Sequence, residues 1–314
     1  MNEQRIEISK NVLRDCLGLS SHEVLAVIAD DAKRELGESI YEAGKRLGAE
    51  TLFLLMQERS KSGEEPPAAI AEAMIRADVA VCVTEHSMTH TRARKEAAAS
   101  GTRVATMPGM TDDMFSHGAI NADYLQVKAL TEKVTAMLSG GSTVRIAKEG
   151  YSLTVPIHGR DGVPSTGMYL NPGESGNLPS GEAYIAPVEG TAEGQILVDG
   201  SVAGIGALKN PMLLTVAHGR LSAAEGEAGE QLLKMLGEGD GRWLGEFGIG
   251  TNNKARITGV VLEDEKVYGT IHVAFGSNNT FGGTIAAGVH IDAVVMKPDV
   301  YIDDVLIMRA GELI

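Results

Sequence analysis

The stretch His22-Glu-Val-Leu-Ala-Val-Ile-Ala-Asp30 decides the fold class of the first part of the chain. It is apolar from Val24 to Ala29 and ends on an aspartate, which is typical of a buried strand that leads into a helix. Residues 32–48 then place apolar side chains on one helical face, and Gly48 marks the end of that helix. The stretch therefore predicts a strand followed by a helix, the repeating unit of an α/β domain.

The same alternation of strand and helix continues to about residue 139. We predict strands at residues 51–56, 77–83 and 103–107, helices at 67–75 and 91–99, and one or two closing helices within 111–138. Strands that are joined through helices run parallel, so the sequence predicts a parallel sheet with helices on both faces. No Gly-x-Gly-x-x-Gly motif follows the first strand, which argues against a dinucleotide-binding domain.

Beyond residue 143 the apolar residues recur at every second position, which is typical of strands. One helix is predicted at 223–236, the glycine-rich segment 248–254 is predicted to be a tight turn, and strands are predicted at 145–147, 151–157, 182–186, 195–198, 212–216, 255–262, 270–275, 288–296 and 300–308. With Ser139-Gly-Gly-Ser142 as the linker, we predict an α/β domain over residues 1–140 and a β-rich α+β domain over residues 141–314.

Charge and cysteine content limit the classes of binding partner and the cellular compartment that we expect. The 314 residues include 42 acidic and 28 basic side chains, and the net charge of −14 argues against a nucleic-acid-binding surface. The apolar runs fall short of the ~20 residues that a membrane-spanning helix needs, and the first residues lack the apolar core of a signal peptide. Neither Cys16 nor Cys82 lies in a Cys-x-x-Cys motif. We expect a cytoplasmic protein with neither a nucleic-acid nor a membrane partner.

Candidate metal ligands lie in the second predicted domain. His290 and Asp292 are two positions apart on one strand, so their side chains share a face. His272 lies in a second apolar strand, where a buried imidazole needs a partner. Three carboxylates join them, two in apolar stretches and one in a charged segment that is equally typical of a turn: Glu182, Glu246 and Glu265. Nitrogen and oxygen ligands without thiolates suit zinc, cobalt, manganese or iron, and their number exceeds what one tetrahedral ion uses, which favours two metals.

Four stretches that contain these residues occur in an order typical of one family: Gly181-Glu182-Ala-Tyr-Ile-Ala-Pro187, Gly245-Glu246-Phe-Gly-Ile-Gly250, Asp264-Glu265 followed by His272-Val-Ala-Phe-Gly276, and His290-Ile-Asp292. Over residues 151–304 the chain resembles the aminopeptidase T family of metallopeptidases. The resemblance implies that all six residues are metal ligands, with about two divalent ions of cobalt, zinc or manganese per chain, a peptide substrate and a homodimer. The segment Ser277-Asn-Asn-Thr-Phe281 lacks a tyrosine that this family carries.

The resemblance predicts a metalloaminopeptidase, a hydrolase in which Glu182 or Glu246 takes the proton of a metal-activated water. The same scaffold is similar to 2,5-dihydroxypyridine 5,6-dioxygenase, in which two histidines and an aspartate hold a single ferrous ion. A mononuclear non-haem iron ring-cleaving dioxygenase is therefore the alternative, and a binding protein that keeps the fold without catalysis is a third hypothesis. The presence of both glutamates favours hydrolysis over the two others.

Overall fold

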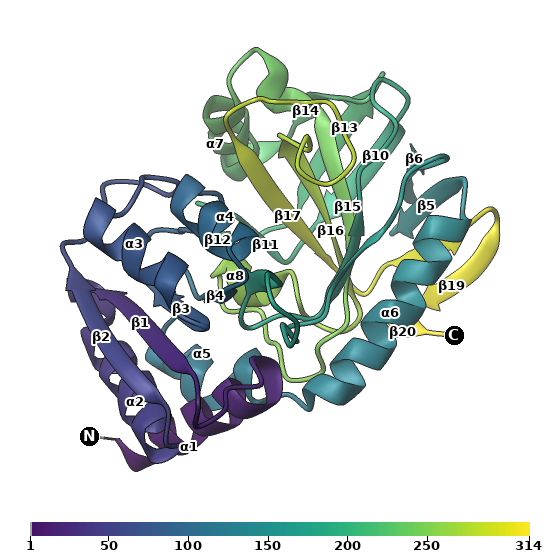
Figure 1. Ribbon diagram of the computed structural model, residues 1–314. Coiled ribbons are helices and arrows are strands. Elements are labelled where there is room, and N and C mark those ends of the chain that lie inside the picture. Colours follow the sequence, from purple (N-terminus) through teal and green to yellow (C-terminus); the bar gives the residue numbers. More distant parts are fainter. Residues whose placement is uncertain (1) are drawn as a thin grey trace. The chain divides into compact units, whose positions relative to one another are not determined.

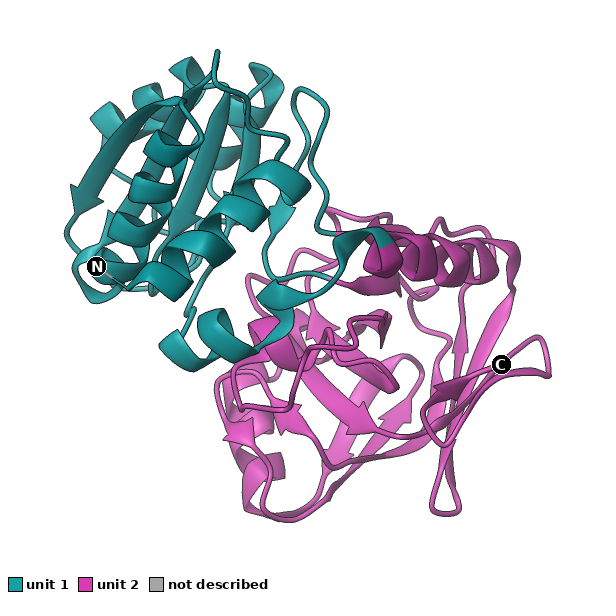
Figure 2. Ribbon diagram, turned by 90° about the horizontal axis from the view of Figure 1, so that it is seen from below, with its two compact units in different colours: residues 1–125, 167–180 teal, residues 126–166, 181–314 magenta. Residues whose placement is uncertain are grey.

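The computed structural model describes residues 2–314 (Figure 1). The chain divides into two units, which Figure 2 shows in different colours. Unit 1 runs up to Leu125 and also includes Gly167–Ser180, and unit 2 comprises Gln126–Thr166 and Gly181–Ile314. Within residues 2–314, none of the helices is both long and apolar enough to cross a membrane.

This division differs from the predicted domains, 1–140 and 141–314, at two places. Helix α6 (Tyr124–Gly140) lies almost entirely in unit 2, because its buried Val134 and Leu138 belong to the apolar core of that unit. Gly167–Ser180 returns to unit 1 and supplies a strand to its sheet. Residues 139–142 therefore lie within unit 2, at the junction of α6 and β5, rather than in a linker between domains.

Unit 1 is built on a five-stranded parallel sheet, as the sequence predicts. The strands lie in the order β2-β1-β3-β4-β8, with the bounds β1 Val24–Asp30, β2 Glu50–Met56, β3 Val79–Val83, β4 Arg103–Thr106 and β8 Ser175–Asn177. The edge strand β8 comes from a part of the chain far from β4, so no local pattern predicts this pairing.

Helices cover both faces of this sheet, which confirms the predicted fold of the first part of the chain. On one face, Ala26 and Ile28 of β1 pack in the same apolar cluster as Ile70 and Met74. On the other face, Gly37 lies against side chains of β1 and β2. The helices of unit 1 are α1 Glu3–Asn11, α2 Arg34–Arg46, α3 Ala68–Arg76, α4 Arg92–Ala99 and α5 Asp112–His117, and a short π-helical turn, Val12–Cys16, follows α1.

Unit 2 contains two antiparallel sheets. The eight-stranded sheet has the order β14-β13-β10-β6-β5-β18-β19-β20, with β5 Thr143–Lys148, β6 Tyr151–Pro156, β10 Glu193–Val198, β13 Met212–Ala217, β14 Arg220–Ala224, β18 Asp299–Ile302, β19 Val305–Arg309 and β20 Glu312–Leu313. The seven-stranded sheet has the order β12-β11-β17-β16-β15-β9-β7, with β7 Val163–Ser165, β9 Glu182–Ile185, β11 Ser201–Val202, β12 Gly206–Ala207, β15 Leu244–Gly250, β16 Thr270–Gly276 and β17 His290–Met296.

The two sheets of unit 2 share one apolar core. Ile146 and Leu153 of the eight-stranded sheet are buried in the same cluster as Phe247 and Val273 of the seven-stranded sheet. Helices α6 and α7 (Gly226–Leu236) contribute further apolar side chains to this core. Because only one face of each sheet meets the core, the other face of the seven-stranded sheet is available for polar side chains.

Three sequence predictions for unit 2 are wrong. The single strand predicted at 300–308 is the antiparallel pair β18 and β19, with a turn at residues 303–304. Residues 248–250 continue strand β15 instead of forming a tight turn, and residues 255–262 form a loop that leads into the short helix α8 (Val261–Asp264) instead of a strand. The carboxylate of Asp264 accepts hydrogen bonds from the backbone nitrogens of Thr258 (2.6 Å) and Gly259 (2.9 Å). The Asp264 side chain therefore satisfies the backbone N–H groups of this loop. In a strand, a neighbouring strand would have to accept those hydrogen bonds.

Candidate metal centre

One face of the seven-stranded sheet carries most of the candidate ligands, whereas its other face lies in the core. The core face of β15, β16 and β17 is apolar and comprises Phe247, Ile249, Ile271, Val273, Phe275, Ile291, Ala293 and Val295. Since side chains alternate between the faces of a strand, the polar residues between them point away from the core: Glu246, His272, His290 and Asp292. Strand pairing aligns them, because Ala274 of β16 lies opposite both Glu246 and Asp292.

Gly248 makes room for the buried imidazole of His272. It is the residue of β15 that lies opposite His272, and a Cβ atom at Gly248 would lie 2.1 Å from His272 Nε2. No side chain fits at that distance. Glycine in the middle of β15 therefore serves the close approach of a functional side chain, although the same glycine weakens the strand signal in the sequence.

Two imidazoles and two carboxylates meet at one end of the cluster, which we call the imidazole end: Glu246, His272, His290 and Asp292. The Nε2 atom of His272 lies 3.1 Å from Glu246 Oε1. The Nε2 atom of His290 lies 3.4 Å from Glu246 Oε2 and 3.5 Å from Asp292 Oδ1. Ligand atoms of Glu246, His272 and Asp292 lie within 4.8 Å of one another. His272 is fully buried, whereas 31% of the His290 side chain is exposed, so the imidazole end reaches the surface at His290.

A buried ammonium group occupies the other end, which we call the lysine end: Glu182, Glu265 and Lys266. The Nζ atom of Lys266 donates a hydrogen bond to Glu182 Oε1 at 2.6 Å and forms a second ion pair with Glu265. Lys266 is fully buried, and the Glu182 side chain is 9% exposed. His272 links the two ends, because its Nε2 atom lies 3.5 Å from Glu182 Oε2.

The loop between β16 and β17 orients His290. The Nδ1 atom of His290 donates a hydrogen bond to the carbonyl oxygen of Ser277 at 2.8 Å, which leaves Nε2 directed at the carboxylates. Phe281, in the same loop, lies with its ring edge-on to those of Tyr184 (5.3 Å between centroids) and His290 (6.1 Å). An aromatic surface thus borders the imidazole end.

Buried carboxylates keep both imidazoles protonated when no metal is bound. Burial alone lowers the pKa of His272, but the hydrogen bond to Glu246 and the charge of Glu182 raise it to about 9. Burial also lowers the pKa of His290, yet the charge of Asp292, a hydrogen bond to it and the charge of Glu246 raise the pKa to about 10. The Asp292 pKa, which burial raises, falls to about 2 because of the His290 charge. A metal ion bound here must therefore displace protons from both imidazoles.

The lysine end keeps its positive charge. Burial alone lowers the pKa of Lys266, but the charges of Glu182 and Glu265 raise that pKa above its usual range. Burial raises the pKa of Glu265 to about 8, against the opposing charge of Lys266. Both carboxyl groups lie against the Lys266 ammonium.

The donor set fits a divalent transition metal. Imidazole nitrogens and carboxylate oxygens without thiolates suit iron, manganese, cobalt or zinc. Two buried atoms, Glu182 Oε2 and His272 Nδ1, have no hydrogen-bond partner within residues 2–314. Buried polar atoms without a partner are rare in folded proteins and point to a bound group or water at the site.

The structure brings the six candidate residues into one connected cluster, although their role as ligands stays a prediction. Glu246, His272, His290 and Asp292 face one another, whereas Glu182 and Glu265 bind Lys266. The sequence analysis missed Lys266, because a lysine that follows Glu263-Asp-Glu265 is typical of an exposed charged turn. The apolar strand that begins only four residues later, at Thr270, is the one signal that this segment enters the interior.

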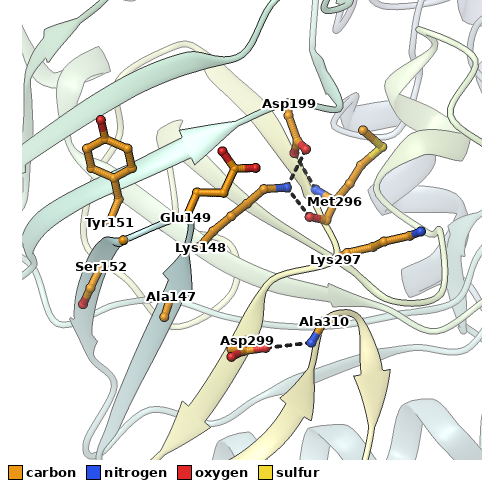
Figure 3. Close-up of a pocket in the computed structure, with 11 residues that line it drawn as sticks. Ala147, Lys148, Glu149, Tyr151, Ser152, Asp199, Met296, Lys297, Asp299 and Ala310 are labelled. Carbon is orange, nitrogen blue, oxygen red and sulfur yellow. Dashed lines mark hydrogen bonds and ion pairs between the residues drawn. The ribbon is translucent and has the colours of Figure 1, made fainter.

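A cavity of about 730 Å³ lies elsewhere in unit 2, between the turn after β5 and the turn after β17 (Figure 3). Figure 3 shows Lys148 directed at the Asp199 carboxylate and the Met296 carbonyl oxygen, and Asp199 also accepts a hydrogen bond from the Met296 nitrogen at 2.9 Å. None of the six candidate residues lines this cavity. The chemistry is therefore to be sought at the polar face of the seven-stranded sheet.

Comparison with known families identifies the scaffold. The family model described as NicX, 2,5-dihydroxypyridine 5,6-dioxygenase, matches residues 4–314. The chain belongs to this family. A curated relative of the NicX-family chain, the 2,5-dihydroxypyridine 5,6-dioxygenase of Pseudomonas putida (strain KT2440), is 24% identical to it over 186 residues. That alignment covers 54% of the present chain and 53% of the relative, so the chain spans about half the length of the curated protein that it matches.

Two solved structures have the same fold as the NicX-family chain. The structure of 2,5-dihydroxypyridine dioxygenase from Pseudomonas putida KT2440 matches with a TM-score of 0.85 and 17% identity, over 100% of this chain and 98% of that one. Wild-type AmpT from Thermus thermophilus matches with a TM-score of 0.72 and 19% identity, over 99% of each chain. The predicted relation to a scaffold that aminopeptidase T and the dioxygenase share is thus confirmed.

The predicted activity, in contrast, is wrong. The family model and the curated relative name a dioxygenase, so the prediction of a metalloaminopeptidase, a hydrolase acting as a protease, does not hold for this NicX-family chain. The alternative in the sequence analysis, a dioxygenase of the dihydroxypyridine type, is the one that the family supports. The prediction of hydrolysis rested on Glu182 and Glu246 as ligands of a second metal or as the base, and it overlooked Lys266, which pairs with Glu182 and Glu265.

Proposed function

We propose that this chain is a ring-cleaving dioxygenase in which His272, His290 and Asp292 hold one ferrous ion. The observation that carries the proposal is their position on two neighbouring strands, β16 and β17, on one face of a sheet, in a chain whose family model bears the name of a dihydroxypyridine dioxygenase. Two histidines and one carboxylate are a ligand set typical of non-haem iron oxygenases, since it leaves coordination positions open. The substrate class that we propose is an electron-rich dihydroxylated pyridine.

The lysine end supports a single metal. Glu182 and Glu265 already bind an internal cation, the Lys266 ammonium, so the three ligands of the imidazole end remain for one ion. Ferrous iron, when bound, supplies the one-electron chemistry with dioxygen that amino-acid side chains lack. The protein itself supplies orientation, a proton acceptor and a surface for the substrate ring.

Each of these tasks has a candidate residue. The carbonyl oxygen of Ser277 fixes the tautomer of His290, so that Nε2 is the free donor. Glu246, buried between the two imidazoles, is the carboxylate that accepts the proton of a substrate hydroxyl at one of its Oε atoms. The rings of Phe281 and Tyr184 offer an aromatic surface next to His290, against which a pyridine ring packs.

The test is oxygen consumption by the iron-loaded chain. After removal of bound metals with a chelator and reloading with ferrous iron under nitrogen, the chain is mixed with 2,5-dihydroxypyridine and air. We expect one dioxygen consumed for each ring lost, no reaction of the zinc-loaded chain, and full activity of the control variant His158→Ala, which changes an exposed histidine. An iron-loaded chain that consumes no oxygen with any dihydroxylated pyridine refutes the proposed function.

A further inference from the structure

Lys266 is a cation built into a cluster that otherwise collects carboxylates. Its Nζ atom donates a hydrogen bond to Glu182 at 2.6 Å and forms an ion pair with Glu265. Only 1% of its side chain is exposed. A lysine is almost never fully buried unless opposite charges pair with it, because the loss of hydration is costly. The ammonium is therefore held in place by these two carboxylates.

The backbone around Lys266 fixes the ammonium in this position. The backbone nitrogen of Lys266 donates to Glu263 O at 3.0 Å, and its carbonyl oxygen accepts from the nitrogen of the buried Asn252 at 2.8 Å. Gly250 of β15 permits this approach, since a Cβ atom there would lie 2.1 Å from Val267 O and 2.8 Å from the carbonyl carbon of Lys266. Lys266 is thus hydrogen-bonded to Asn252, just after the strand that carries Glu246, and its backbone packs closely against Gly250 at the end of that strand.

Without the ammonium, the lysine end has the ligands of a metal site. One ligand atom from each of Glu182, Glu265 and His272 lies within 4.8 Å of the others. Glu182 Oε2 is buried, has no hydrogen-bond partner within residues 2–314 and lies 3.5 Å from His272 Nε2, so an oxygen without a hydrogen bond faces the place where such an ion would bind. A divalent ion at this place would stand next to the fixed positive charge of Lys266, and like charges repel strongly where water is excluded.

We propose that Lys266 limits the centre to one metal, because its ammonium takes the place of a second divalent ion between Glu182 and Glu265. The inference rests on the proposed function, which assigns one iron to the imidazole end. It adds a role for the lysine end, which the three proposed iron ligands do not include. Lys266 is in this sense a positioning residue: it keeps Glu182 and Glu265 paired with an internal cation and so keeps the number of metal ligands low.

The experiment counts bound metal ions in the full chain, with cobalt(II) alone as the probe. The variant Lys266→Met keeps most of the side-chain volume and removes the charge. We expect one cobalt per wild-type chain and two per K266M chain after desalting, with a second set of visible absorption bands in K266M. The double variant K266M/E182Q should return to one ion, because the second ion loses a charged ligand. Lys254→Met makes the same change at an exposed lysine and should remain at one ion.

K266M leaves Glu182 buried without its counter-charge, so the variant is produced both with and without divalent metal in the medium. The proposal expects added metal to restore folding if the metal-free variant is unstable, and a variant that stays unfolded with metal overturns it. Two ions in the wild type, or one ion in folded K266M, likewise overturn the inference while leaving ring cleavage by the iron-loaded wild type untouched. One ion in the wild type without ring cleavage refutes the proposed function alone.

Discussion

The imidazole end and the lysine end share a sheet face and an acidic character, but they obtain their positive charge in different ways. At the lysine end the cation is part of the chain, since Lys266 binds Glu182 and Glu265. At the imidazole end the positive charge lies on protons of His272 and His290, which the proposed metal ion would replace. A count of carboxylates therefore does not give a count of metals, because a carboxylate such as Glu265 can already be paired with a cation of the chain.

The largest expected difference between the two ends follows from removing one side chain at each. His290→Ala deletes a proposed iron ligand, and we expect ring-cleaving activity to fall by at least about 100-fold, since even partners of metal ligands typically contribute 10–100-fold. Glu265→Gln at the lysine end keeps the imidazoles intact, and we expect it to retain activity within about tenfold. Iron content, steady-state rate and far-ultraviolet circular dichroism of both variants decide the matter. Equal losses of iron in the two variants would contradict the separation into two ends.

The pH dependence of metal binding is the next largest expected effect, and it arises at the imidazole end alone. The folded-state pKa values of His272 and His290, about 9 and about 10, lie above the ordinary value of 6.5, so both imidazoles are charged at pH 7 without metal. Metal binding needs them neutral, so affinity should rise with pH by up to about two log units per pH unit below pH 9. Titration calorimetry in buffers of different ionisation enthalpy should report about two protons released per ion.

The stability of the metal-free chain should change with pH in the opposite direction to its metal affinity. Raised histidine pKa values stabilise the folded state below pH 6.5, and this contribution is lost as pH rises through about 9 and 10. The melting temperature without metal should therefore fall between pH 7 and pH 10, whereas the gain in melting temperature on adding metal should grow. His158→Ala should change neither trend. Metal binding without proton release would show that the imidazoles are neutral before the ion arrives.

Sequence reasoning succeeded where structure is local and failed where it depends on distant partners. The strand that contains Ile28 was predictable because it is a continuous apolar run, and the helix that contains Ile40 because it buries one repeating apolar face. Strand β8 was not, since its pairing with β4 joins distant segments. The end of strand β15, residues 248–250, was mistaken for a turn because glycines at 248 and 250 lower strand propensity, and only the packed structure shows what they accommodate. The charged segment before Val267 gave no sign that Lys266 would be buried.

The smallest effect is expected from substitutions at two glycines of β15. Gly248 makes room for the imidazole end, and Gly250 makes room for the lysine end. Gly248→Ala places a Cβ atom 2.1 Å from His272 Nε2, and Gly250→Ala places one 2.1 Å from Val267 O, next to Lys266. Overpacking of this kind typically costs about 1–3 kcal/mol, so both variants should melt at lower temperature than the wild type. Only Gly248→Ala displaces a proposed ligand, and we expect it alone to weaken cobalt(II) binding, by about tenfold.

The matched control is Gly239→Ala, because a Cβ atom at Gly239 would meet nothing within 4 Å. Melting temperatures and cobalt(II) affinities of the three variants separate general destabilisation from a specific effect on the imidazole end. A Gly250→Ala chain that loses cobalt(II) affinity as much as Gly248→Ala would mean that the position of Lys266 affects the imidazole end directly. In that case His272, which lies 3.5 Å from Glu182 Oε2, would couple the two ends into one site.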